Sequence, residues 1–324
     1  MSPLPEVSAY VRDRLLGLPR AHDLAFIFPG QGSQKAGMGK EIAGLSATAR
    51  DVFRAADDTL GGGFATLCFE GPDEELTRTA NAQPAILATS IAHLVAAVET
   101  RTVTHCPAFV AGHSLGEYTA LVVAGSLEFQ DALLLVRERG RLMEEAGARG
   151  GTMAAIVALN EETVREICDL SGAELANCNS PSQFVIGGAA AAVERACALA
   201  KEGGGRSLPV QVSGAFHTSL MAPAADQFAA VIDEAAIRDP KMPVVSNVTA
   251  RPMTAAAEVR DDLRRQVRSP VLWHQSIETM KSAGVAAFVE IGARVLTAIL
   301  KRSYPELSSQ AWDSAAALAS PTNV

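Results

Sequence analysis

Gly112, Ser114 and Gly116, each separated by one residue, form the sharpest chemical signal in the sequence. A short apolar run precedes them and an Ala/Leu/Val-rich segment follows, so the motif is predicted to join a strand to a helix. Glycine on either side permits a tight turn that lifts a serine hydroxyl clear of a sheet, where it can act as a nucleophile. The N–H of Leu115, at the predicted helix start, could then face a developing oxyanion. The alternative, a glycine-rich turn with a capping serine, fits the predicted strand-turn-helix order less well.

A serine hydroxyl needs a neighbouring base to become a useful nucleophile. Of the six histidines, the pattern favours His217 over His274, because His217 lies in a small-residue loop between a predicted strand and a predicted helix. The side chain of His113 should diverge from Ser114 at the turn. No acidic residue stands out at a strand end between Ser114 and His217, where the usual α/β-hydrolase order places the third member of a triad.

Arg139 is the most informative charged residue. On a predicted helix over 127–146, at about 100° per residue, it falls within the apolar stripe, whereas Arg137 and Arg141 lie on the opposite face. A buried guanidinium without a partner is strongly unfavourable, so it must meet a carboxylate or a phosphate. Two interpretations stay open: an internal salt bridge, with Glu128 as a conceivable partner, or a bidentate clamp for a substrate carboxylate.

A second loop, Gly30-Gln31-Gly32-Ser33-Gln34, follows the first predicted strand. It is not a Walker A loop, because Met38 stands where the lysine is required. Its exposed N–H groups could supply a second oxyanion donor, and a plain turn fits equally well.

The elements that must position these residues alternate between strand and helix, which predicts an α/β fold with a mostly parallel sheet. Strands are expected at 24–28, 108–111, 243–247 and 286–291, and helices at about 36–60, 84–99, 127–146, 219–236, 258–267, 274–283 and 293–303. Between them, a β-α-β-β-α-β order is typical of the ferredoxin-like arrangement. Its strands are expected at 153–159, 174–178, 183–187 and 207–212, and its helices at 161–170 and 190–201.

We therefore expect a large α/β-hydrolase-like domain (23–147 and 214–305) with a small inserted ferredoxin-like domain (148–213). Residues 1–22 are expected to form an N-terminal extension, either an amphipathic segment or a linker remnant. The C-terminal tail, 306–324, has weak periodicity and is expected to be loosely held.

Composition narrows the class of protein. The chain has 324 residues, 48% of them hydrophobic, and a formal net charge of −8, which argues against broad nucleic-acid binding and low-complexity disorder. No run is expected to reach the roughly 18 apolar residues of a membrane span. The five cysteines lack C-x-x-C spacing, so reduced thiols in a cytoplasmic enzyme are the simplest interpretation.

Taken together, these residues resemble the malonyl-CoA:acyl carrier protein transacylase family, which includes the acyltransferase domains of polyketide synthases. The resemblance covers about residues 23–303. The motifs that carry it are, in order, Phe28-Pro29-Gly30-Gln31-Gly32-Ser33-Gln34, Gln83-Pro84, Gly112-His113-Ser114-Leu115-Gly116-Glu117, Arg139-Gly140, Asn177-x-Asn179-Ser180-Pro181, Gly214-Ala215-Phe216-His217 and Gln266-x-x-x-Pro270-Val271-x-Trp273.

The resemblance implies a role for each matched residue. Ser114 would be the acylated nucleophile and His217 its base, oriented by the main-chain carbonyl of Gln266, which would explain the missing acid. The backbone N–H groups of Gln31 and Leu115 would form the oxyanion hole.

The substrate side follows in the same way. Arg139 would pair with the free carboxylate of a malonyl group, so the resemblance favours the clamp over the salt bridge. Asn177 and Asn179 would lie near the pantetheine arm. Leu115 and Phe216 match members of the family that select unsubstituted malonyl groups.

The implied reaction is ping-pong transfer from malonyl-CoA to the phosphopantetheine thiol of an acyl carrier protein, for fatty acid or polyketide synthesis. No metal, tightly bound cofactor, nucleic acid or membrane is expected, and the family suggests a monomer. Carrier proteins are acidic, so a basic patch is needed, and its candidates are Lys35, Lys201, Arg206, Arg264, Arg265 and Arg268. A thioester hydrolase with the same Ser-His pair and a non-enzymatic docking module are the competing hypotheses.

Overall fold

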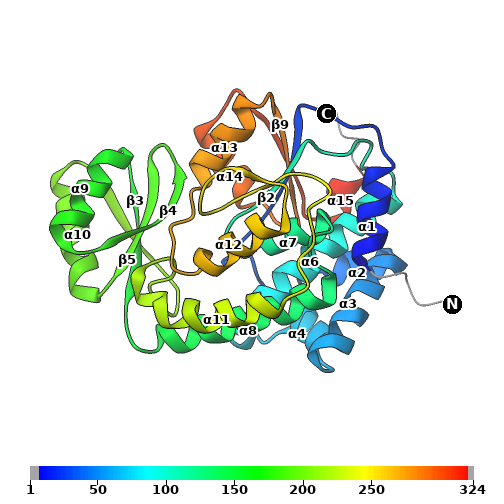
Figure 1. Cartoon of the computed structure of the whole chain (residues 1–324), viewed down its shortest axis with the longest axis horizontal. Coiled ribbons are helices and arrows are strands. Elements are labelled where there is room, and N and C mark those ends of the chain that lie inside the picture. Colours follow the sequence, from blue (N-terminus) through cyan, green and yellow to red (C-terminus); the bar gives the residue numbers. More distant parts are fainter. Residues whose placement is uncertain (1–6, 320–324) are drawn as a thin grey trace.

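The computed structural model describes residues 7–319, which form two sheets with helices packed against them (Figure 1). The larger sheet has the strand order β10-β9-β1-β2-β7-β8. All of its neighbouring strands pair in parallel except β7 and β8, which are antiparallel. The predicted α/β class with a mostly parallel sheet is confirmed. Its strands are β1 (Leu24–Phe28), β2 (Phe109–Gly112), β7 (Val244–Val245), β8 (Pro252–Met253), β9 (Ala287–Ile291) and β10 (Ser308–Trp312).

Helices cover both faces of this sheet, and its central strand β1 is therefore buried along its whole length. Phe26 and Phe28 point into one hydrophobic cluster, whereas Ala25 and Ile27 point into another, as the two-residue period of a strand requires. The helices outside the smaller unit are α1 (Val7–Leu16), α2 (Lys40–Leu45), α3 (Ala47–Leu60), α4 (Phe64–Glu70), α5 (Asp73–Thr77), α6 (Thr79–Glu99), α7 (Gly116–Val123), α8 (Phe129–Gly147), α11 (Ala222–Glu234), α12 (Ala256–Gln266), α13 (Trp273–Ser282), α14 (Leu296–Ser303) and α15 (Ala315–Leu318), with a 3-10 turn at Ser219–Met221.

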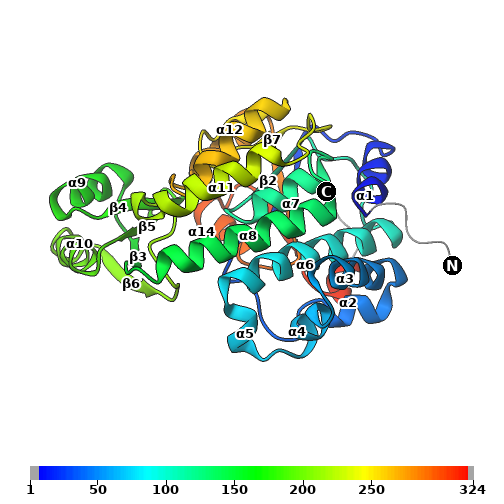
Figure 2. The same ribbon diagram turned by 60° about the horizontal axis from the view of Figure 1, so that its bottom comes forward.

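Helix α6 corrects one expectation from the sequence. Its 21 residues are long and apolar enough to cross a membrane by length and composition alone. In the described residues, however, 89% of its most apolar window is buried inside the protein. Figure 2 shows α6 beside α8 and α3, where a helix that is apolar on all sides has partners for every face.

The smaller unit lies at the left of Figure 1 and contains an antiparallel sheet of order β4-β5-β3-β6. Two helices pack against this sheet around a separate hydrophobic cluster. Its elements are β3 (Thr152–Val157), α9 (Glu161–Ser171), β4 (Glu174–Ser180), β5 (Gln183–Gly188), α10 (Ala190–Glu202) and β6 (Arg206–Val210). The predicted sequence of strands and helices in this segment is confirmed, with ends that shift by one or two residues.

Main-chain hydrogen bonds tie the smaller unit to the larger one at Val271. The N–H of Cys178 in β4 donates to the Val271 carbonyl at 2.8 Å, and the Val271 N–H donates to the Ala176 carbonyl at 2.9 Å. Val271, in the loop that follows α12, therefore pairs in parallel with Asn177 at the β4 edge of the smaller sheet.

The first and last described elements, α1 and α15, belong to the larger unit. In α1, Val11 and Leu15 are fully buried, and the Phe129 N–H donates to Ser8 Oγ at 2.6 Å. Residues 1–6 and 320–324 lie outside the described part.

The prediction of a loosely held C-terminal tail is wrong for residues 306–319. Strand β10 pairs in parallel with β9, and Trp312, 2% exposed, meets the ring of Phe26 edge-on at 5.6 Å. The weak periodicity reflects an edge strand, whose side chains are mostly half-buried.

Candidate active site

Ser114 occupies a strained turn between β2 and α7, with a backbone φ of +51°. A Cβ at Gly112 would lie 1.9 Å from the carbonyl carbon of Gly116, and a Cβ at Gly116 would lie 2.2 Å from the Phe28 carbonyl oxygen. Only glycine fits at both positions, so the two glycines permit the turn that raises the Ser114 hydroxyl.

His217 faces that hydroxyl. Its Nε2 lies 2.7 Å from Ser114 Oγ, and its Nδ1–H donates to the Gln266 carbonyl at 2.9 Å, with the Ser269 carbonyl at 3.2 Å. A carbonyl can only accept, so these contacts place the proton on Nδ1 and leave the Nε2 lone pair toward the serine. Like Ser114, His217 has a left-handed backbone, with a φ of +61°.

The surroundings of His217 favour the neutral imidazole. Burial, the nearby Arg139 cation and His113 lower its pKa to about 3, against the opposing effect of the two carbonyls. A neutral imidazole is the form that can accept a proton from a hydroxyl.

Arg139, 1% exposed, lies on the far side of the same hydroxyl. Its Nη2 donates to Ser114 Oγ and to Gln266 Oε1, each at 3.0 Å, and its Nη1 donates to Gln83 Oε1 at 2.8 Å. The Tyr118 ring lies 5.6 Å from the guanidinium carbon. The oxygen partners accept hydrogen bonds from the Arg139 guanidinium, but they are neutral and do not cancel its positive charge.

The internal salt bridge to Glu128 that the sequence left open is wrong, because Glu128 pairs with Arg238 instead. Within residues 7–319, no carboxylate makes an ion pair with Arg139. Burial lowers the pKa of Arg139, against the smaller opposing effects of Tyr118 and Glu117.

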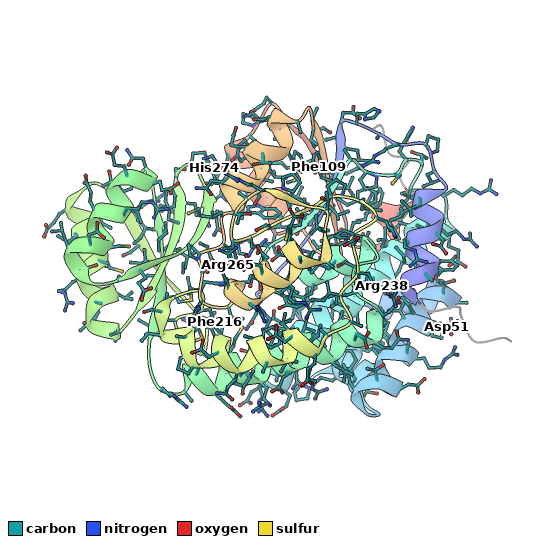
Figure 3. All side chains as sticks on the ribbon, in the orientation of Figure 1. Asp51, Phe109, Phe216, Arg238, Arg265 and His274 are labelled. Carbon is teal, nitrogen blue, oxygen red and sulfur yellow. The ribbon has the colours of Figure 1, made fainter. Side chains whose placement is uncertain are left out.

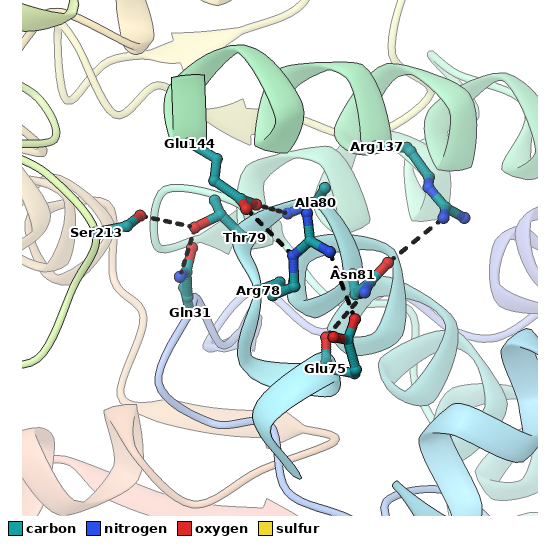
Figure 4. A network of polar contacts seen from close by, with 9 residues as sticks. All are labelled: Gln31, Glu75, Arg78, Thr79, Ala80, Asn81, Arg137, Glu144 and Ser213. Carbon is teal, nitrogen blue, oxygen red and sulfur yellow. Dashed lines mark hydrogen bonds and ion pairs between the residues drawn. The ribbon is translucent and has the colours of Figure 1, made fainter. Parts of the chain in front are cut away.

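The Gln31 loop lies against the serine turn. A Cβ at Gly30 would come within 2.6 Å of the His113 carbonyl, so glycine allows the two loops to touch. Across the described chain, neither Gln31 N–H nor Leu115 N–H donates to a protein acceptor. The side-chain amide of Gln31 donates from Nε2 to Thr79 Oγ1 at 3.4 Å, and Thr79 Oγ1 lies 3.2 Å from Ser213 Oγ (Figure 4).

Asn179 joins the site, whereas no side-chain hydrogen bond within residues 7–319 connects Asn177 to it. His113 Nε2 lies 2.8 Å from Asn179 Oδ1, so the histidine beside the serine turns toward β4. Asn177 Oδ1 is buried without a hydrogen-bond partner in the part of the chain that the structure describes. Phe216 is buried next to His217.

His274 lies elsewhere. It contacts the Tyr304 hydroxyl from α13, and Figure 3 labels it on a different part of the fold from Phe216.

Four further side chains hold the site although no role was predicted for them from the sequence: Gln83, Glu117, Asn247 and the side chain of Gln266. The first two and Gln266 occur in the motifs that carry the family resemblance. Asn247 Oδ1 accepts from the Ser114 N–H at 2.6 Å, and its Nδ2 donates to the Gly112 carbonyl at 2.7 Å. One sequence signal was available for Glu117, because a carboxylate in the apolar run after the serine motif must be buried. The others depend on contacts across the fold.

A groove of about 770 Å³ opens beside the Gln31 loop, with walls from both units. Its lining includes Gln31, Thr79, Val210 and Ser213. The ion pair between Arg78 and Glu144 borders it (Figure 4). Among residues 7–319, no cluster of three or more His, Cys, Asp or Glu side chains could hold a metal ion.

This arrangement of a serine, a histidine and two main-chain N–H groups without protein acceptors, on an α/β sheet of the described chain, is typical of acyl transfer. Residues 25–320 match the family described as the acyl transferase domain, and the chain belongs to that family.

The chain is also similar to individual relatives and solved structures of this family. The chain is 47% identical over 287 residues to the malonyl CoA-acyl carrier protein transacylase of Bacillus subtilis (strain 168), covering 86% of this chain and 90% of that protein. An acyl carrier protein S-malonyltransferase from Vibrio cholerae superposes with a TM-score of 0.88 at 40% identity, over 92% of this chain and 99% of that one. A malonyl-transacylase solved in complex with a type II polyketide synthase acyl carrier protein gives the same TM-score and identity. That superposition covers 92% of this chain and 98% of the other. The family resemblance read from the motifs is thereby confirmed.

Proposed function

We propose that this protein transfers a malonyl group from malonyl-CoA to the phosphopantetheine thiol of an acyl carrier protein, through an ester on Ser114. One observation carries the proposal: Ser114 Oγ lies between a neutral base, His217 Nε2 at 2.7 Å, and an uncompensated buried cation, Arg139 Nη2 at 3.0 Å. The names of the relatives support the same substrate and acceptor.

In the first half-reaction, Ser114 Oγ attacks the thioester carbonyl while His217 Nε2 takes the hydroxyl proton. The N–H groups of Gln31 and Leu115 are suited to stabilise the oxyanion, because neither is used by a protein acceptor. When the carbon–sulfur bond breaks, the leaving CoA thiolate receives the proton from His217, and malonyl remains as the Ser114 ester.

In the second half-reaction, the thiol of the carrier arm gives its proton to His217 and attacks the ester. Ser114 Oγ leaves and takes that proton back, so the enzyme is regenerated without a metal or a tightly bound cofactor in the scheme. The groove beside Gln31 suits the arm that delivers either thiol.

Arg139 acts as the clamp for the free carboxylate of the malonyl group. Its present partners, Gln83, Gln266 and Ser114, are all neutral oxygens, so the substrate supplies the missing countercharge. A buried cation of this kind favours acyl groups that carry a carboxylate over those that do not.

Of the predicted basic residues, Arg206 is the one that we assign to the anionic partner, together with Arg302, which was not among those predicted. Arg264, Arg265 and Arg268 are held in ion pairs with acidic neighbours. Arg206 has no ion pair within residues 7–319 and, with Arg302, lines a cavity of about 290 Å³. We assign this cavity to phosphate groups of the arm or of CoA.

The remaining finer assignments are proposals of the same kind. The order β4-β5-β3-β6 supports a ferredoxin-like domain over 148–213, inserted in an α/β-hydrolase-like domain. Buried Leu115 and Phe216 support selection of unsubstituted malonyl groups, and Asn179 supports placement of the pantetheine arm near β4. The monomeric state and the cytoplasmic location stay predictions.

Intact-mass measurement tests the proposal. Incubation with malonyl-CoA should add one malonyl group to the protein and none to the Ser114→Ala variant. Holo carrier protein should then remove the group and gain it, whereas apo carrier protein, which lacks the thiol, should not. Release of free malonate at the same rate with and without holo carrier would instead support the thioester hydrolase, and no adduct at all would support the docking module.

A further inference from the structure

Glu117 is a buried acid that the proposed chemistry does not use, yet it contacts Gln266, a neighbour of Arg139 and His217. It is fully buried in the first turn of α7, and its N–H donates to the Ser114 carbonyl at 3.2 Å. Its Oε1 accepts from the main-chain N–H of Asn247 at 3.0 Å, and its Oε2 accepts from Gln266 Nε2.

The side chain of Gln266 is the centre of these contacts. Its Nε2 donates to Glu117 and, at 3.0 Å, to the Ser114 carbonyl, while its Oε1 accepts from Arg139 at 3.0 Å. The assignment is forced by chemistry, because a guanidinium can only donate and therefore requires the amide oxygen. The amide nitrogen must then face acceptors, and Glu117 is one of the two.

Asp262 completes the cluster. It is 2% exposed, its Oδ1 accepts from the Ser246 hydroxyl, and its Oδ2 is buried without a hydrogen-bond partner among residues 7–319. Burial and the proximity of Asp262 raise the pKa of Glu117. Glu117 accepts from Gln266 in this cluster.

We propose that Glu117 is a positioning residue for acyl selection: it holds the Gln266 amide with its oxygen on Arg139 and so keeps the guanidinium aimed at the substrate carboxylate. This inference rests on the proposed transfer of malonyl groups. Glu117 touches neither Ser114 Oγ nor Arg139 directly, and acts only through Gln266 and the serine turn.

The variant Glu117→Gln keeps the size of the side chain but changes one of its acceptors to a donor. It therefore tests the hydrogen bonds of Glu117 apart from its volume. The main-chain N–H of Asn247 cannot turn, so the new amide oxygen stays on it and the new amide nitrogen faces Gln266 Nε2. Two donors then oppose each other, and Gln266 relieves the conflict by turning its own amide, which presents nitrogen to Arg139. The guanidinium loses an acceptor that the wild-type geometry provides at 3.0 Å.

Asp262→Asn is the matched control. It makes the same carboxyl-to-amide change in the same buried pair, but its new amide nitrogen can donate to Glu117, which keeps both of its acceptor roles. Asp262→Asn should therefore retain the preference for malonyl over acetyl groups.

The experiment measures acylation of Ser114 by malonyl-CoA and by acetyl-CoA in the wild type, E117Q, E117D and D262N, with thermal melting of each protein. We expect the malonyl-to-acetyl ratio to fall by about tenfold in E117Q. The ratio should be intermediate in E117D, which keeps an acceptor one methylene further back, and unchanged in D262N.

The outcomes separate the two proposals. An unchanged ratio in E117Q, or equal losses in E117Q and D262N, would overturn the positioning role. If E117Q does not fold, the ratio in E117D decides, and a wild-type ratio there overturns the role as well. A wild-type protein that never forms the malonyl ester would instead overturn the proposed function.

Discussion

At the scale of single residues, the buried Arg139 is the feature with the most direct chemical consequence. Its hydrogen-bond partners are neutral oxygens, and burial lowers its pKa against the smaller opposing effects of Tyr118 and Glu117. A cation held in this way stabilises a bound carboxylate more than the same cation would in water, because solvent screens it less.

Arg139→Ala should abolish the preference for malonyl groups. We expect kcat/KM for malonyl-CoA to fall by at least about tenfold, the range for losing hydrogen bonds to a charged group. Acetyl transfer should be retained or gained, since acetyl has no carboxylate to lose. Steady-state rates with the two acyl-CoAs check this, and an unchanged ratio would refute the clamp.

His217 gives a prediction for pH dependence. Its pKa is lowered from 6.5 to about 3, so the neutral base persists as the pH falls through 6.5. The acylation rate should show no acid limb near pH 6.5 in the wild type. In Arg139→Ala, one cause of the lowering is gone, so the acid limb should move to higher pH. A pH profile of single-turnover acylation in both proteins checks this, and an identical limb in both would contradict it.

The same shift affects folding. Between pH 6.5 and 3, the unfolded chain takes up a proton on His217 that the folded chain does not. The contribution of His217 to the free energy of unfolding is therefore lost as the pH falls through this window.

At the scale of elements, the join between β2 and α7 decides whether the hydroxyl is presented at all. The turn depends on glycine at two positions and on the Asn247 amide, which spans it from the Gly112 carbonyl to the Ser114 N–H. The strain of a left-handed serine is held by these contacts.

Gly116→Ala should therefore destabilise the protein and reduce acylation. The new Cβ would lie 2.2 Å from the Phe28 carbonyl, so β1 and α7 must separate, and we expect a loss of more than about 1 kcal/mol. Gly44→Ala in α2 is the control, because a Cβ there meets nothing within 4 Å and should stabilise the helix by up to about 1 kcal/mol. Urea unfolding of both variants checks this, and equal effects would count against the close approach.

Prediction from sequence succeeded where a local pattern carries the information. The strand-turn-helix around Ser114 and the inward face of α8 at Arg139 follow from spacing and periodicity. The Asn247 clamp does not, because it joins residues 133 positions apart along the chain. Helices α4 and α5 and the two-residue strand β8 were missed because segments this short hold too few turns or alternations to show a period.

At the scale of the whole molecule, the C-terminal strand β10 closes one edge of the larger sheet. Sequence reasoning set this segment aside because an edge strand has only one paired side and shows no clear alternation. Its pairing with β9 brings residues from the end of the chain against β1 at the centre of the fold.

Trp312→Ala should show that this segment belongs to the folded unit. Truncation of a buried tryptophan removes its contacts with Phe26 and leaves a cavity, so we expect a loss of about 3–5 kcal/mol in the free energy of unfolding. Leu45→Ala, at a side chain 70% exposed, should change it by no more than about 0.5 kcal/mol. Chemical denaturation checks this, and a small effect at Trp312 would mean that the tail contributes little.

The end of α12 and the short loop after it serve both units at once. The carbonyls of Gln266 and Ser269 hold the imidazole, and two residues later Val271 pairs with β4. Anyone building chimaeras by exchanging the smaller unit between relatives would therefore have to transplant residues 266–271 along with it. A graft that kept the recipient's residues 266–271 would pair them with a β4 strand from another protein. The same residues orient the His217 imidazole.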